Sequence, residues 1–242
     1  MHAVVLLHAF PLDRRMWRAQ LATLEAEGVR AFAPDLRGFG AASAAPHPTS
    51  LDEHADDVAA LLDRHGEHLA HVVGLSMGGY VALAFAKKHA SRLAGLVLAD
   101  TRASADSPAA RLARDTNIAK VRAEGTSALV EGMLPKLLSP RAHASVIAEV
   151  RAIASEHPIE GLAAALAAMR DREDLTHVAE QLRLPTTIVV GAEDVITPKD
   201  EAQELAHRMK DAKYVELAGA GHLSNLEQSH AFSRAILDHV RT

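Results

Sequence analysis

The chain has 242 residues, with 26 Lys and Arg against 31 Asp and Glu, so its formal net charge is −5. A chain of this length is most economically one domain, and its mild acidity argues against nucleic acid or an anionic membrane as a partner. It contains no cysteine, which excludes a disulfide framework and a cysteine-based metal site. Nothing at the N-terminus resembles a signal peptide and no apolar run is long enough to span a membrane, so we expect a cytoplasmic protein.

The first part of the chain alternates between short apolar strands and helices. Residues 3 to 8 and 29 to 33 are predicted strands, and the helix pattern between them ends near Gly28. A polar loop follows the second strand. Ser50 and Glu53 have the spacing of a capping box, which predicts that another helix begins there.

Residues 74 to 79 (GLSMGG) follow a third predicted strand, and residues 80 to 86 are apolar on nearly every side of a helix. A turn this tight strains its central residue, and glycines two places either side let neighbouring backbone approach without Cβ clashes. Strand, sharp turn and helix around Gly-x-Ser-x-Gly are typical of a nucleophile elbow. We therefore predict that Ser76 is a nucleophile exposed above the sheet; the alternative is a serine in an ordinary turn.

A long helical stretch separates the fourth predicted strand, residues 93 to 99, from the next strand pattern. The intervening segment is rich in Ala, Leu, Arg and Glu and is interrupted by glycine and proline. It is far longer than a crossover in a βαβ unit requires. We predict a helical lid over residues 103 to 183, inserted into a core formed by residues 1 to 102 and 184 to 242.

After the lid the alternation resumes. Strands are predicted over residues 186 to 190 and 214 to 217, with Thr197 as the N-cap of the helix between them and Pro198 at its first position. One last helix extends through Leu226 and Ile236. This alternation predicts a parallel sheet with both faces covered and with reactive groups at the carboxyl ends of the strands.

A serine nucleophile needs a base to take its proton and an acid to orient that base. Asp194 and Asp100 each follow a predicted strand, and Glu193 is a third candidate acid. We favour Asp194 because it precedes a histidine-bearing loop, which gives the chain order Ser, Asp, His. The alternative role for Asp100 is a strand-end residue that binds nearby backbone amides.

The chain has 15 histidines, so a single histidine carries little information. His222 is distinct because it follows the glycine-rich residues 219 to 221, just after the last predicted strand, and we predict that it is the general base. Most other histidines are predicted to be solvated, among them His47, His54, His65, His143 and His157.

Acyl transfer also needs hydrogen-bond donors for the developing oxyanion. We predict the backbone amide of Met77, at the start of the helix after Ser76, and that of Phe10, in the loop after the first strand. The alternative is that this loop is merely a turn. The sequence has no phosphate-binding glycine loop, no dinucleotide fingerprint and no His/Glu metal spacing, so neither metal nor cofactor is expected.

Five motifs together resemble the α/β-hydrolase superfamily over essentially the whole chain. They are HAFP (residues 8 to 11, similar to HGxP), DLRGFG (35 to 40), GLSMGG (74 to 79), GAEDVITP (191 to 198) and GHLSNLE (221 to 227). The last is similar to the histidine loop of carboxylesterases and 3-oxoadipate enol-lactonase-like members. Ala9 replaces the usual glycine of the first motif, which leaves the geometry of the oxyanion loop in question. Because the chain starts at what would be the third strand of the family, we expect an α/β-hydrolase fold with about six strands, all parallel.

The resemblance implies a serine hydrolase that cleaves small-molecule carboxylic esters, or lactones, through an acyl-enzyme. One alternative is a C–C hydrolase or a lyase of the menaquinone-pathway type with the same three residues. Another is a non-catalytic ligand receptor, which the intact serine, aspartate and histidine disfavour.

The lid is expected to set substrate choice. An arginine-lined cavity would favour a di-acid substrate and an apolar one a simple ester; the available arginines are Arg102, Arg111, Arg114, Arg122 and Arg141. Candidate apolar lining residues, which could equally pack one lid helix on another, are Met133, Leu134, Leu137 and Leu138.

Overall fold

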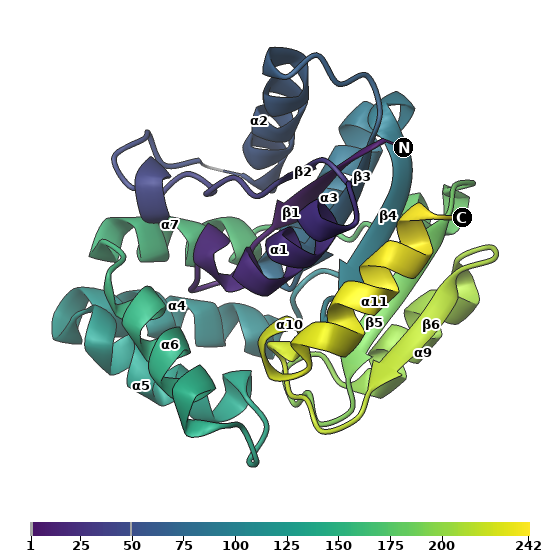
Figure 1. The fold of residues 1–242 in the computed structure, drawn as a ribbon. Helices are drawn as coiled ribbons and strands as arrows, with labels where there is room; N and C mark the ends of the chain where they lie inside the picture. The colour runs from purple at the N-terminus through teal and green to yellow at the C-terminus, as the bar shows by residue number, and fades with distance from the viewer. Residues whose placement is uncertain (1, 49) are drawn as a thin grey trace.

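The computed structural model describes residues 2–48 and 50–242. A six-stranded sheet with the strand order β2-β1-β3-β4-β5-β6 forms its centre (Figure 1). Every neighbouring pair of strands is parallel, as predicted. The strands are β1 (Ala3–Leu7), β2 (Ala31–Phe32), β3 (Ala70–Leu75), β4 (Leu93–Ala99), β5 (Thr186–Gly191) and β6 (Lys213–Leu217).

The inner strands are buried on both faces, which explains their nearly continuous apolar sequences. The two edge strands differ. β6 is partly exposed, and β2 is only two residues long, shorter than the predicted strand over residues 29 to 33. It pairs with β1 alone, through Ala31 and Phe32, so no second neighbour extends its ladder.

Helices cover both faces of the sheet. Figure 1 shows α1 (Arg18–Ala26) and α11 (Ser229–Val240) in front of it, in contact with each other. The opposite face is covered by α2 (Leu51–Arg64), α3 (Met77–His89) and α9 (Lys199–Arg208). Short 3₁₀ helices span Arg14–Trp17, Gly40–Ala42 and Ala90–Arg92. Within the described ranges, no helix combines the length and the hydrophobicity that a bilayer span requires.

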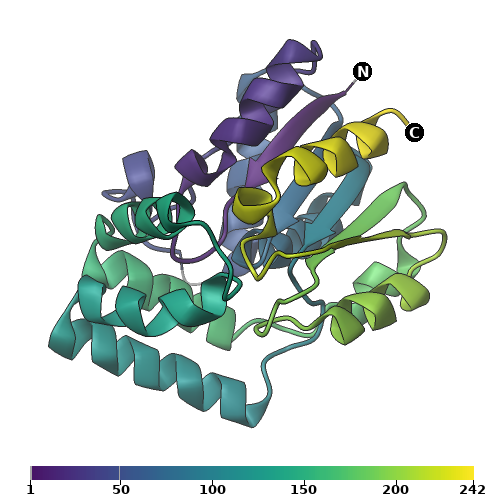
Figure 2. The same ribbon diagram turned by 60° about the horizontal axis from the view of Figure 1, so that its bottom comes forward.

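Five helices lie between β4 and β5 in the described chain, and the first four of them are inserted at the end of the sheet away from both chain termini (Figure 2). We call these four helices the lid: α4 (Pro108–Glu124), α5 (Thr126–Leu137), α6 (Ala144–Ser155) and α7 (Ile159–Arg170). Ser107 caps α4 by accepting a hydrogen bond from the Ala110 amide, and Pro108 occupies the first turn. α8 (Thr176–Gln181) contacts α3 and α9 of the core. The domain boundaries at residues 103 and 183 remain a prediction.

Two glycines bring the lid into backbone contact with the core. Gly38 has φ +92°, and its carbonyl oxygen would lie 2.4 Å from a Cβ added at Gly161 on α7. Such a distance is far below a van der Waals contact. The loop over residues 35 to 40 therefore supports α7 directly, which gives this sequence motif a structural role.

We expect Gly161→Ala to lower the free energy of unfolding by about 1–3 kcal/mol, because backbone must shift to admit the methyl group. Gly132→Ala on α5 is the matched control, since a Cβ there meets only the flexible Lys120 ammonium, at 3.3 Å. Alanine at that helical position should instead be neutral or stabilising. Urea unfolding of both variants measures the difference, and equal midpoints would contradict the close packing.

Of three predictions about helix ends, one is confirmed in part and two are wrong. α2 begins where the capping-box spacing predicts, with Ser50 as its N-cap, but the Ser50 side chain makes no capping hydrogen bond. Pro198, not Thr197, is the N-cap of α9, because Thr197 binds Asp194 instead. The predicted last helix is two helices, α10 (Ser224–Glu227) and α11, with a break at Gln228.

The prediction that His54 and His157 are solvated is also wrong, since both are buried. His8, His71 and His239 are buried as well. Burial lowers the pKa of His8, His54 and His71 to about 4 and that of His239 to about 3. These side chains are therefore neutral in the folded protein near neutral pH.

We expect the protein to lose stability as the pH falls from about 6.5 to about 4. In this range the unfolded chain binds protons on these histidines while the folded state does not, so protonation favours unfolding. Each such histidine contributes up to about 1.4 kcal/mol per pH unit. Urea midpoints across this range measure the slope, and His54→Gln should make it shallower. A midpoint independent of pH would contradict the prediction.

Candidate active site

Ser76 lies in the turn between β3 and α3 with φ 54° and ψ −113°, a sparsely populated conformation for a residue with a side chain. A Cβ at Gly74 would lie 2.2 Å from the carbonyl oxygen of Gly78, and one at Gly78 would lie 2.0 Å from that of Leu7. The two glycines of the motif are therefore required by close backbone contacts. Contrary to the prediction of an exposed serine, Ser76 is only 8 % exposed.

Thr101, which sequence reasoning missed, supports this turn from the end of β4. Its hydroxyl donates a hydrogen bond to the Ser76 carbonyl oxygen at 2.9 Å. A Cβ at Gly79 would lie 2.5 Å from the Thr101 side chain, which explains the third glycine of GLSMGG. Thr101 thus fixes the backbone on which the serine side chain stands.

The structure brings Ser76, Asp194 and His222 together from three separate loops. His222 Nε2 lies 2.8 Å from the Ser76 Oγ, and His222 Nδ1 lies 2.8 Å from the Asp194 Oδ2. All three side chains are buried. With Nδ1–H donating to the carboxylate, Nε2 is free to accept the serine proton, which is the arrangement needed to activate a hydroxyl.

A ring of donors holds the Asp194 carboxylate. Oδ1 accepts hydrogen bonds from the amides of Ile196 at 2.8 Å and Thr197 at 3.0 Å, and the Thr197 hydroxyl donates to Oδ2 at 2.6 Å. Burial raises the pKa of Asp194, but His222 and Thr197 outweigh it and hold that pKa below its ordinary value. The carboxylate is therefore charged at neutral pH. The signal for Thr197 was its position three residues after an aspartate, a spacing typical of side-chain to backbone turns.

The other two candidate acids make different contacts. Asp100 is fully buried, and its carboxyl group binds the Gly191 amide at 2.8 Å and the Ser224 hydroxyl. Burial and the nearby Asp194 charge raise the pKa of Asp100 well above its ordinary value. Glu193 forms an ion pair with Arg141. Asp100 thus has the strand-end contacts of its alternative role.

The loop that contains Phe10 is held by His8. The ring Nε2 accepts a hydrogen bond from the Leu36 amide at 3.0 Å, so Nδ1 carries the proton and donates to the Ala9 carbonyl oxygen at 3.1 Å. Ala9, in place of the usual glycine, is buried, and its amide contacts the Met16 sulfur at 3.2 Å. The alanine is accommodated without loss of this loop.

The amides of Phe10 and Met77 are the predicted oxyanion donors. Within residues 2–48 and 50–242, neither of them donates a hydrogen bond to another protein group. Backbone amides without a protein acceptor are available to donate to the oxygen atom of a ligand. In the same described ranges, no group of three His, Asp or Glu side chains is arranged to hold a metal ion.

A cavity of about 360 Å³ lies between α4, α5 and the loop after β5. Ser76 is not part of the cavity wall, but Tyr80 and Ile196 are. The Tyr80 amide donates to the Ser76 carbonyl oxygen, and the Ile196 amide donates to the Asp194 carboxylate. Met133 lines this cavity, as predicted. The other predicted lining residues are instead buried in an apolar cluster: Leu134, Leu137 and Leu138.

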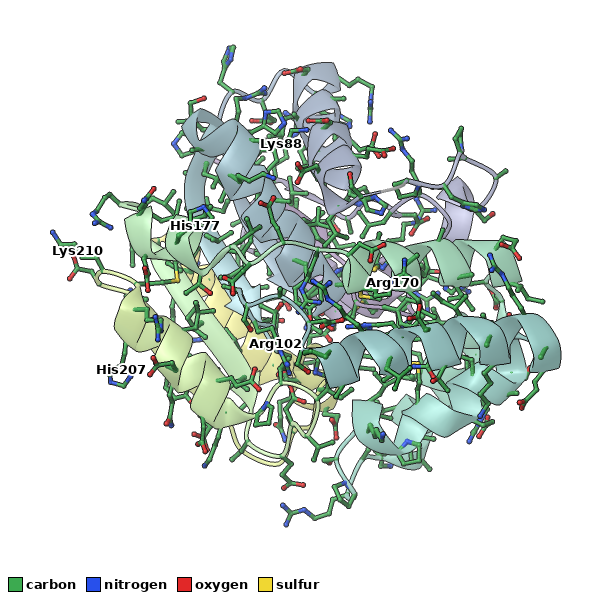
Figure 3. The ribbon with its side chains drawn as sticks, turned by 180° about the vertical axis from the view of Figure 1, so that it is seen from behind. Lys88, Arg102, Arg170, His177, His207 and Lys210 are labelled. Atoms are coloured by element: carbon green, nitrogen blue, oxygen red, sulfur yellow. The ribbon has the colours of Figure 1, made fainter. Side chains whose placement is uncertain are left out.

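Two of the five candidate arginines, Arg102 and Arg114, line the same cavity. Figure 3 shows Arg102 at the junction between the lid and the core. The others lie elsewhere: Arg122 pairs with Glu160, Arg141 with Glu193, and Arg111 binds the Asp106 carbonyl oxygen. The wall of this cavity is therefore partly cationic and partly apolar.

Comparison with known proteins agrees with the fold and with the sequence motifs. Residues 4–235 match the alpha/beta hydrolase family, and the chain belongs to this family. It is similar to a thermophilic esterase from Thermogutta terrifontis with malate bound, with 40% identity and a TM-score of 0.95 over 100% of this chain and 90% of that chain. The enol-lactonase from Burkholderia xenovorans LB400 has 30% identity and a TM-score of 0.90, over 100% and 92% of the two chains. The 3-oxoadipate enol-lactonase 2 of Acinetobacter baylyi is 25% identical over 237 residues, which are 97% of this chain and 86% of that protein. The predicted resemblance to esterases and enol-lactonases is thus confirmed.

Proposed function

We propose that the protein is a serine hydrolase that cleaves carboxylic esters of small molecules, including lactones, through an acyl-enzyme. The observation that carries the proposal is the continuous contact from Ser76 through His222 to Asp194, with both hydrogen bonds at 2.8 Å. The similarity to esterases and enol-lactonases supports the same reaction class.

In the first half of the reaction, the Ser76 Oγ attacks the substrate carbonyl carbon while its proton passes to the His222 Nε2. Asp194 holds the Nδ1–H and stabilises the imidazolium. The amides of Phe10 and Met77 donate to the oxyanion of the tetrahedral intermediate. As this intermediate collapses, His222 returns the proton to the leaving alkoxide, and an acyl group remains on Ser76.

In the second half, His222 takes a proton from a water molecule that attacks the acyl carbon. The same two amides stabilise the second oxyanion, and the proton then passes from His222 to the Ser76 oxygen as the carboxylic acid leaves. His222 accepts one proton and releases one proton in each half, so it is neutral again at the end of both. For a lactone, the released alcohol stays in the same molecule as the acid.

A panel of p-nitrophenyl esters with different acyl lengths, assayed beside several lactones, tests this function. We expect turnover of at least one ester and stoichiometric labelling of Ser76 by a fluorophosphonate probe. Labelling without turnover of any ester or lactone would overturn the proposal. It would direct attention to a C–C hydrolase, a lyase or a ligand receptor.

A further inference from the structure

The cavity between α4, α5 and the loop after β5 has more cationic than anionic side chains in its wall, although the chain as a whole has a net charge of −5. Asp106 is the one carboxylate in its wall, and it is already bound by Arg114 at 3.1 Å and by Arg172 at 2.6 Å. The cationic side chains in the wall are Arg102, Arg114, Lys120 and Lys136. A local excess of one charge in a concave site favours a ligand of the opposite charge.

Both arginines of the wall are already paired with carboxylates of the protein. Arg102 lies 3.0 Å from Glu201 and also binds the Ile196 carbonyl oxygen, and Arg114 is paired with Asp106. By contrast, the side chains of Lys120 and Lys136 form no ion pair or hydrogen bond with another residue of the described chain. These two ammonium groups are therefore the charges that a ligand could neutralise.

Lys120 reaches across the cavity wall from α4 to α5. Its Nζ lies 3.3 Å from the position that a Cβ at Gly132 would occupy, so the absence of a side chain there leaves room for the ammonium group. Lys136 extends from the next turn of α5. The two lysines thus face the same cavity from adjacent lid helices.

Apolar side chains form another part of the cavity wall. Leu129, Met133 and Ile196 line the cavity, and Tyr80 stands one helical turn after Ser76. An acyl chain with its carbonyl carbon at Ser76 could follow these side chains and end near the lysines. Such a chain would be short and apolar, with an anionic end.

We propose that Lys120 and Lys136 bind a carboxylate at the far end of the acyl group, so that the preferred substrates are monoesters of dicarboxylic acids or lactones that carry a carboxylate. This inference rests on the proposed ester hydrolysis. A neutral ester of the same length makes the same apolar contacts but leaves both lysines unpaired. The difference between charged and neutral esters is therefore mainly a difference in KM.

The test compares monomethyl adipate with methyl hexanoate, and monomethyl suberate with methyl octanoate, by pH-stat. Within each pair the acyl chains have the same length and differ in the terminal charge. The variants are Lys120→Gln, Lys136→Gln and the double variant, which remove charge and keep side-chain length. Lys210→Gln is the control, because Figure 3 shows Lys210 at the edge of the molecule away from the lid.

We expect the unsubstituted protein to prefer the anionic ester of each pair by about tenfold or more in kcat/KM, the range of a hydrogen bond to a charged group. The double variant should lose this preference through a higher KM, with the neutral esters unaffected. Added salt should reduce the preference for the anionic ester in the unsubstituted protein and in Lys210→Gln, but not in the double variant, which has no such preference to lose.

Two results would overturn the inference while leaving ester hydrolysis intact. One is equal kcat/KM for charged and neutral esters in the unsubstituted protein. The other is an equal loss on both kinds of ester in the lysine variants, which would indicate a structural role. No turnover of any ester would instead show that the proposed function itself is wrong, and the inference with it.

Discussion

Ser76→Ala is expected to lower kcat for ester hydrolysis by about 10⁴-fold or more, because no acyl-enzyme can form without the hydroxyl oxygen. Residual activity above that of water would come from the oxyanion amides and substrate binding. The fold should persist, since alanine is smaller than serine and meets the same strain at φ 54°. Initial rates with the best ester of the panel, together with a thermal unfolding midpoint, measure both expectations.

The matched control is Ser127→Ala, which removes an exposed hydroxyl from the lid helix α5. This variant should keep its activity and its reaction with the fluorophosphonate probe, whereas Ser76→Ala should lose both. Full turnover by Ser76→Ala would show that another group is the nucleophile. The hydrogen bond from Ser76 to His222 would then be structural only.

The second large effect separates the two aspartates that follow strands. Asp194→Asn should lower kcat by about 10³–10⁴-fold, because the amide cannot stabilise the imidazolium and favours the wrong tautomer of His222. Asp100→Asn should cost less than about tenfold. Burial and the nearby Asp194 charge raise the pKa of Asp100 well above its ordinary value, which favours its neutral form, and an amide has the same shape as that form and no charge.

An asparagine at position 100 can also form a hydrogen bond with each partner of the aspartate, with the direction of the bond to Ser224 reversed. Its oxygen can accept from the Gly191 amide, and its NH₂ can donate to the Ser224 hydroxyl. Measuring kcat for both variants with one ester decides between the two acids. A large loss for Asp100→Asn beside a small loss for Asp194→Asn would assign the acid to the strand after the nucleophile helix, and the proposed roles of Ser76 and His222 would stand.

Local sequence was sufficient for the sheet and for the turn at Ser76. The four inner parallel strands are buried on both faces, so their apolar runs predicted them within a few residues. Of the two edge strands, β6 was also predicted closely, whereas β2 is markedly shorter than predicted. The glycines around Ser76 were readable because close backbone contact leaves no room for a Cβ. Such constraints act over a few residues and therefore leave a local signal.

The acid could not be chosen from the residues alone. Asp100 and Asp194 both follow strands at the carboxyl-terminal end of the sheet. They differ in which residues, distant in the sequence, contact their side chains. His222 lies 2.8 Å from Asp194, whereas Ser224 and Gly191 bind Asp100. Chain order favoured Asp194 by resemblance, but the contact itself depends on how the loop after β6 folds over the sheet.

The sequence by itself determined the parallel sheet, the helical insertion and the strained turn at Ser76, because strand burial, helix periodicity and glycine sterics are properties of neighbouring residues. Only the tertiary structure decided which histidines are buried, that Thr197 binds Asp194 rather than capping a helix, and that Met133 faces a cavity while Leu137 is packed in the core. Each of these depends on which distant surface covers a side chain. The packing of the lid and the loops against the sheet determines this burial. Neither the type of a residue nor its sequence neighbours predict which distant segment will cover its side chain.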